Sequence, residues 1–340
     1  MAQTGRHRTM DVLDSIFRLR TAAVAALVFT LCAAAARASI VPLPGGTAPV
    51  VRVAVRDGLV TVRTWNRSDV QVQGDHVEQA RAFSAQAVAR ALRGDVPIFA
   101  TKVQTRSGAV ALPAESFPLG SLPDGDHPGV AVRADGNVVV TVPSATSLML
   151  LNANRGGILV RGYHGTLVAR LHNGPIMLQN FSGSAYLESA RGRIFVNDSM
   201  LDRMRARTAI GNIVFNNCTA REIEVSSVDG AVVYDNGTFA PGLARFESQN
   251  GPVAVGVAGG NVQIGAHSNG GRIFTDFSRA TVNGNGSDAR AVVGDGGPVV
   301  TVASGSTVYL YDGSLARHRN AGFAWHQLRV RIPRLQKKLP

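Results

Sequence analysis

The sequence has 340 residues, of which 45% are hydrophobic, and its formal net charge is +12. Most of this charge lies at the two ends, because the segment between Ser39 and Asp312 holds 23 basic and 21 acidic residues. A body so close to neutral excludes a nucleic-acid groove, which needs basic residues clustered along the fold.

The first 38 residues have the composition of a secretory signal peptide. Arg18 and Arg20 precede an apolar run over Ala22–Ala36, and Ala36-Arg37-Ala38 fits a cleavage site with small residues. The alternative is an uncleaved anchor, but the run is shorter than the roughly 18 residues of a spanning helix. We therefore expect an exported protein of the periplasm, outer envelope or extracellular space, with residues 39–50 as a linker.

Residues 51–129 contain three different patterns. Alternating valines predict two strands between Val51 and Gln73, joined by a hairpin turn at Asp57-Gly58. An Ala-rich stretch over His76–Arg93 predicts a short helix, because its apolar residues recur at helical spacing. Four prolines within Ser107–Pro128 predict a surface loop or an irregular arm. This part is expected to be a small mixed N-terminal region.

A glycine-led phrase recurs about every 18–21 residues within residues 130–313. In each copy a branched aliphatic residue follows two positions later, and a turn rich in Asn and Asp comes after it. Two short strands and two turns per copy predict an all-β solenoid, or β-helix, of about 7–9 coils. The phrase opens at Gly156, Gly174, Gly192, Gly211, Gly230, Gly251 and Gly271, with a late copy at Gly297.

Stacked copies predict columns of identical positions. The residue two places after each glycine should point inward and form the solenoid core: Ile158, Ile176, Ile194, Ile213, Val232, Val253 and Ile273. The next position should point outward but is still apolar, which makes a candidate interaction column: Leu159, Met177, Phe195, Val214, Val233 and Phe274. A continuous apolar column needs a cover, either the N-terminal region, a second solenoid sheet or a partner protein. On the second strand of each copy the outward positions are instead polar and of mixed sign.

Residues 314–340 form a basic tail without any acidic residue. Alternation over Leu328–Ile332 predicts a terminal strand that caps the open edge of the solenoid. The other interpretation is contact with an anionic lipid, lipopolysaccharide or wall polymer. The candidate basic patch comprises Arg317, Arg319, Arg329, Arg331, Arg334, Lys337 and Lys338.

The Gly-x-Ile-x-Val phrase, its Asn/Asp turns and the Ser/Thr-x-x-Gly corners resemble a bacterial family of putative adhesins. So does the lead-in segment over Asp135–Pro143. The resemblance covers roughly Val130 to Asp312. It implies an exported right-handed β-solenoid related to the head domain of autotransporter adhesins. It implies no catalytic residue.

Catalytic chemistry finds little support in the sequence. Asp198, Asp235 and Asp276 fall at turn positions of different coils, with Asp235 and Asp276 two coils apart and Gly256 between them. A polysaccharide lyase or hydrolase needs carboxylates that converge in one groove. The histidines lack metal-ligand spacing, and Cys218 is a lone cysteine in the expected mature chain. We expect no enzyme activity, no cofactor and no metal.

These observations favour a non-catalytic binding or adhesin-like scaffold of the envelope or cell surface. Its expected partner is an envelope protein or a surface polymer, and not a nucleic acid. The alternative is a structural or envelope-stress component that binds a partner protein through the apolar column. A polysaccharide lyase or hydrolase is the third hypothesis.

Overall fold

The computed structural model describes residues 39–41, 49–84, 95–98, 101–105, 108–112, 115–118 and 128–318. The chain divides into Met1–Ala38 and Ser39–Pro340, and all described residues belong to the second unit. They form an all-β fold with a largely parallel sheet of many strands, consistent with a β-solenoid. The predicted signal peptide and the predicted capping strand at Leu328–Ile332 lie outside the described residues. Among the described residues, no helix has the length and apolar character needed to span a membrane.

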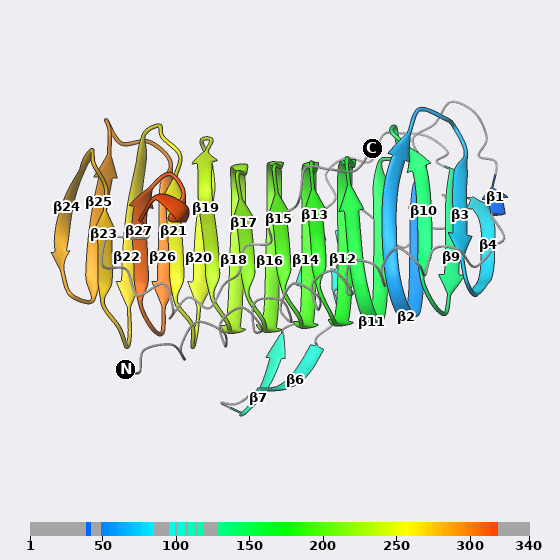
Figure 1. Ribbon diagram of the computed structural model, residues 1–340, viewed down its shortest axis with the longest axis horizontal. Coiled ribbons are helices and arrows are strands. Elements are labelled where there is room, and N and C mark those ends of the chain that lie inside the picture. Colours follow the sequence, from blue (N-terminus) through cyan, green and yellow to red (C-terminus); the bar gives the residue numbers. More distant parts are fainter. Residues whose placement is uncertain are drawn as a thin grey trace, which may run out of the picture. The chain divides into compact units, whose positions relative to one another are not determined.

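The sheet is a stack of rungs (Figure 1). Each rung is either one long strand or two consecutive strands, and both of its parts pair with the same neighbouring rung. The described residues contain ten rungs, against the 7–9 coils predicted. In spatial order, the first three rungs are β9 (Pro128–Ala134) with β10 (Val138–Pro143); β2 (Val50–Trp65); and β11 (Leu148–Arg161). The next four are β12 (His164–Asn173) with β13 (Ile176–Gln179); β14 (Ser182–Arg191) with β15 (Ile194–Asn197); β16 (Met200–Ile210) with β17 (Ile213–Asn216); and β18 (Thr219–Asp229) with β19 (Val232–Phe239). The last three are β20 (Leu243–Ser248) with β21 (Val253–Val257); β26 (Val299–Ser304) with β27 (Val308–Asp312); and β22 (Val262–Ser268) with β23 (Ile273–Asp276).

The rungs do not follow chain order at either end of this stack. β2 lies between β9–β10 and β11, and pairs in parallel with both. At the other end, β26–β27 lies between β20–β21 and β22–β23. Each inserted rung is therefore held on both sides by segments that are distant in sequence.

Antiparallel strands cover the edges of the terminal rungs. β3 (Val70–Gly74) pairs with β10, β4 (Val77–Ser84) pairs with β9, and β1 (Ser39–Val41) pairs with β3. At the opposite end, β25 (Asp288–Val293) pairs with β22 and β24 (Ala280–Asn285) with β25. An unpaired sheet edge invites aggregation, so these strands protect the stack. Two antiparallel strand pairs are not hydrogen-bonded to this sheet: β5 (Asp95–Ile98) with β8 (Glu115–Pro118), and β6 (Thr101–Thr105) with β7 (Gly108–Leu112).

The inward columns are made of identical or similar side chains. Ile176, Ile194 and Ile213 are in direct register and each is completely buried. The same column extends from Ile158 through Val232 and Val253 to Val308. Its far member, Ile273, is only partly buried. Burial of each branched side chain contributes about 1.5–3 kcal/mol.

The glycines that open each copy of the repeat stack at one corner of the rungs. The backbone of the neighbouring rung leaves no room there for a side chain. A Cβ on Gly192 would lie 1.8 Å from the carbonyl oxygen of Gly174, and one on Gly211 would lie 1.9 Å from that of Gly192. Gly174 and Gly211 also have φ of 137° and 150°, a conformation that other residues rarely adopt. Hydroxyls before the glycines donate to the carbonyls of the preceding rung, as in the bond from Ser227 Oγ to Gly211 O at 3.0 Å.

The opposite turn uses asparagine and aspartate in the left-handed conformation. Asn180, Asp198, Asn217 and Asn236 have φ between 50° and 54°. These are the residue types that tolerate this region best after glycine. Asn217 Nδ2 donates to Asp198 Oδ1 at 2.7 Å, so the turn side chains also bond from rung to rung. The Asn/Asp turns of the repeat are thus explained by backbone geometry.

Three predictions for the N-terminal region were wrong. The expected helix over His76–Arg93 is a strand over Val77–Ser84, because pairing with β9 overrides local helix propensity. The expected hairpin at Asp57-Gly58 is a corner inside the continuous strand β2, whose neighbours are all distant in sequence. The expected loop over Ser107–Pro128 contains β7 and β8. All described elements of this region are strands.

The late copy at Gly297 was also misassigned. Val299 should have pointed inward but is 56% exposed, because β26 aligns with β20 and β22 and so belongs to the second-strand column. The first-strand position of this rung is taken by Val308 in β27.

Candidate functional site: an arginine groove

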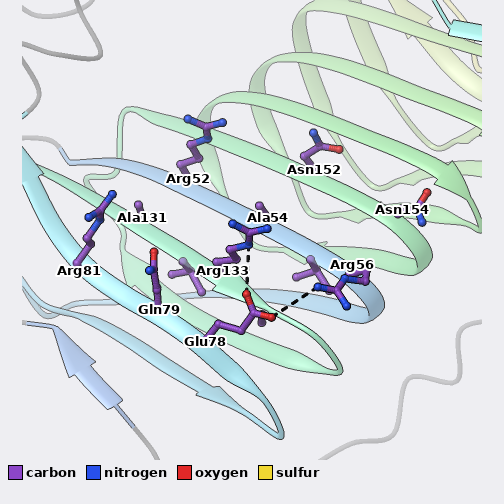
Figure 2. A pocket seen from close by; sticks show the side chains of 13 residues that line it. Arg52, Ala54, Arg56, Glu78, Gln79, Arg81, Ala131, Arg133, Asn152 and Asn154 are labelled. Atoms are coloured by element: carbon purple, nitrogen blue, oxygen red, sulfur yellow. Dashed lines mark ion pairs between the residues drawn. The ribbon is translucent and has the colours of Figure 1, made fainter.

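An open groove with a volume of about 510 Å³ lies on the outer face of the first rungs (Figure 2). Its lining comes from β2, β4, β9 and β11. Arginines dominate its charge, since four arginines face one glutamate. The lining residues are Arg52, Ala54, Val55, Arg56, Glu78, Gln79, Arg81, Ala131, Val132, Arg133, Ala134, Asn152 and Asn154. We call this the arginine groove.

Strand alternation explains which side chains reach the arginine groove. In β2, Val51, Val53 and Val55 are buried, so Arg52 and Arg56 must point to the opposite face. The neighbouring strands present small side chains at the matching positions. Ala131 of β9 is in register with Arg52 of β2, and Ala54 of β2 is in register with Arg133. The alanines form a floor between the arginines.

Glu78 neutralises one side of the arginine groove. Its Oε2 lies 3.2 Å from Nε of Arg133, and its Oε1 lies 3.8 Å from Nη2 of Arg56. Arg56 also approaches Asp135 at 3.2 Å. These exposed pairs are weak, at about 0–1 kcal/mol each. Among the described residues, Arg52 and Arg81 have neither an ion pair nor a side-chain hydrogen bond.

Further along the stack, arginines of the same outer face pair with glutamates of neighbouring rungs. Arg170 and Arg207 approach the two oxygens of Glu188 at 3.2 and 3.0 Å, and Arg205 pairs with Glu224 at 3.1 Å. Tyr186 donates to Glu188 at 2.7 Å. β6 packs against β14 and β16 over this cluster, where Glu188 and Arg207 are buried. The mixed-sign outward positions of the repeat therefore form rung-to-rung ion pairs, in contrast to the arginine groove.

The predicted apolar column is in register, and three of its six predicted residues are buried. Val214 and Val233 are completely buried, and Phe195 is 7% exposed. Leu315 of η1 (Leu315–His318) belongs to the same apolar cluster, so a C-terminal segment contributes to the cover. Leu159 and Met177 are half-buried, and Phe274 is 41% exposed and stacks on Tyr309. The middle of the column is therefore closed to a partner, and exposed apolar surface is left only towards its two ends.

Asp235 anchors this C-terminal segment. It is 2% exposed and accepts hydrogen bonds from the Leu315 backbone at 2.6 Å, the Tyr311 hydroxyl at 3.1 Å and the Ser314 hydroxyl at 3.4 Å. Burial and the nearby Asp235 carboxylate raise the pKa of Tyr311, which keeps this hydroxyl a neutral donor. Asp235 is separated from Asp276 by both Gly256 and Tyr311, one rung more than the sequence indicated, because β27 is inserted.

We expect Asp235→Ala to loosen the η1 segment. Three donors would lose their acceptor, at a cost of about 1–3 kcal/mol in the free energy of unfolding. Limited proteolysis should then cleave near Leu315 faster than in the parent. Asn250→Ala, which removes an exposed side chain hydrogen-bonded to Asp229, serves as control and should leave this cleavage rate unchanged. Equal cleavage rates in parent and Asp235→Ala would contradict the anchoring role.

The other candidate groups have structural surroundings. Cys218 is buried, its thiol faces the carbonyls of Val196 and Asn216, and burial raises its pKa to about 12, which leaves the thiol unreactive. His267 lies 2.7 Å from Asp288, and this hydrogen bond raises its pKa. No group of three or more His, Cys, Asp or Glu that could hold a metal ion occurs within the described part of the chain. Of the basic patch, Arg317 is exposed, and the other members lie outside the described residues.

The alternation of valines with Arg52 and Arg56 is visible in the sequence, but it does not by itself predict the arginine groove. Its other charges come from Glu78, Arg81 and Arg133, which stand on strands that pair only in the folded chain. Because a helix was predicted over residues 76–93, the strand β4 and the side chains that it adds to the arginine groove were not predicted. The local signal in the sequence is the alternation of Arg52 and Arg56 with valines, which places both arginines on the outer face of one strand.

Comparison with known proteins adds a structural similarity only. No family model matches the sequence, and no curated protein matches it. The chain is similar to a crystal structure described as a "putative cell adhesion protein" from Clostridium sporogenes, with 7% sequence identity over 82% of this chain and 99% of that chain, and a TM-score of 0.24. With a TM-score this low, the function has to be argued from this chain's own residues.

Proposed function

We propose that this protein is an exported, non-catalytic binding scaffold of the envelope or cell surface, built as a right-handed β-solenoid, and that the arginine groove holds an anionic surface polymer. The observation that carries the proposal is the excess of arginine in an open groove, whereas Arg170, Arg205 and Arg207 further along the same outer face are paired with glutamates. Guanidinium groups bind carboxylate, sulfate and phosphate with directed hydrogen bonds. The rungs beneath give these side chains a rigid base.

The single carboxylate among the lining residues of the arginine groove favours binding over hydrolysis. Glu78 has both oxygens near arginines, so it is poorly placed to act as a general acid. A glycosidase needs a second carboxylate facing the first across the substrate. The competing proposal, a protein partner on the apolar column, is disfavoured because Val214 and Val233 are buried.

Binding of the purified protein to an immobilised acidic polysaccharide tests this proposal. We expect Arg52→Glu with Arg133→Glu to reduce binding at least tenfold, because charge-assisted hydrogen bonds are replaced by repulsion. The control is Arg63→Glu with Arg193→Glu, which changes the same charge at two exposed positions outside the groove and should bind like the parent. The basic tail is the same in all variants. Equal losses in both variants, or release of shortened polymer, would refute the proposal.

A further inference from the structure

Arg52 and Arg81 form a matched pair across one strand. Both are in register with Ala131 of β9, Arg52 from β2 on one side and Arg81 from β4 on the other. Neighbouring strands lie about 4.8 Å apart, so the two arginine Cα atoms are roughly 10 Å apart. The alanine between them leaves a hollow, and Figure 2 shows the two arginine side chains on either side of it.

These two arginines differ from the others of the arginine groove. Arg56 and Arg133 share Glu78, which lowers their attraction for an external anion. Arg52 and Arg81 are exposed and have no partner among the described residues. Two uncompensated positive charges at this separation repel each other within about one Debye length of 8–10 Å. A ligand with two negative groups at the same separation relieves this repulsion and pairs with both arginines.

We propose that Arg52 and Arg81 clamp two carboxylate groups of a linear acidic polysaccharide that runs across β2, β9 and β4. This inference rests on the proposed function and names the ligand class of the same groove. Each guanidinium donates two hydrogen bonds to one carboxylate in the bidentate arrangement. A polysaccharide laid across the strands advances by about one strand spacing per sugar, so carboxylates on alternate sugars reach the two arginines.

The remaining lining fits sugar better than other polyanions. Gln79 and Asn152 lie in the next register row with Arg133 and Ala54, and their amides can both donate to and accept from hydroxyls. None of the lining residues is aromatic, and aromatic side chains are what single-stranded nucleic acids stack on. The alanine floor matches the C–H faces of sugar rings.

The clamp is tested by titration calorimetry with oligosaccharides in which uronic acid alternates with a neutral sugar. A long oligomer carries two or more carboxylates, and a short one carries a single carboxylate. We expect the parent to bind the long oligomer about 10–100-fold more tightly than the short one. Arg52→Gln and Arg81→Gln should each remove this advantage, and the double variant should lose little more. Arg63→Gln is the matched control.

Each result decides between the inference and the proposed function. If Arg133→Gln weakens binding and the two clamp variants do not, the clamp is wrong and the arginine groove stands. If no groove variant affects binding, the proposed function fails as well. If a single-stranded oligonucleotide displaces the saccharide at lower concentration, the ligand class is wrong. Thermal melting of every variant identifies any loss that comes from misfolding.

Discussion

Ile194→Asp should unfold much of the stack at temperatures that the parent tolerates. Ile194 is completely buried between Ile176 and Ile213, and it has no polar neighbour in its column. The variant would bury an unpaired carboxylate, which costs several kcal/mol unless the chain opens or the group becomes protonated. Thermal melting followed by circular dichroism measures the effect. The loss should be smaller at low pH, because the protonated side chain is cheaper to bury.

The matched control for this variant is Met200→Asp. Met200 is 66% exposed at the start of β16, so the same carboxylate stays in water there. We expect its melting temperature to remain close to that of the parent. If Ile194→Asp also melts like the parent, the register of the inward column is wrong.

Gly192→Ala should be the second most damaging change, although it adds a single methyl group. The new Cβ would lie 1.8 Å from Gly174 O and 2.7 Å from Ser189 Oγ. Because the first of these atoms is backbone, the two rungs must separate, and this disturbs the bond between them from Gly174 N to Arg191 O at 2.9 Å. We expect a loss of at least about 1–3 kcal/mol in the free energy of unfolding, the usual cost of overpacking.

Urea denaturation of Gly192→Ala is compared with that of Gly265→Ala. The comparison distinguishes the effect of this clash from the general effect of replacing a glycine with alanine. A Cβ on Gly265 meets nothing within 4 Å, and this glycine lies in strand β22. Its replacement should change the unfolding midpoint little. Equal midpoints for the two variants would mean that the glycine corner is not closely packed.

Much of the repeat could be read from the sequence because its signals are local. A glycine is needed at each corner whatever the rest of the chain does, and the αL turn requires Asn or Asp at Asn180, Asp198, Asn217 and Asn236. The two-residue alternation decides which side chains of a strand point inward, as it does for Ile158 and Val160. These features depend on neighbours within one rung, and the next copy repeats them.

The tertiary structure decided the order of the rungs at both ends and, with it, the candidate site. Nothing local in β2 indicates that it lies between β9–β10 and β11, or that β27 separates Asp235 from Asp276. Such pairings form because the backbone N–H and C=O groups along each strand edge need hydrogen-bond partners and because the inward side chains must fill a shared core. Both requirements are met by segments that are distant in sequence. The clamp of Arg52 and Arg81 exists only because β2 and β4 pair with the two sides of β9.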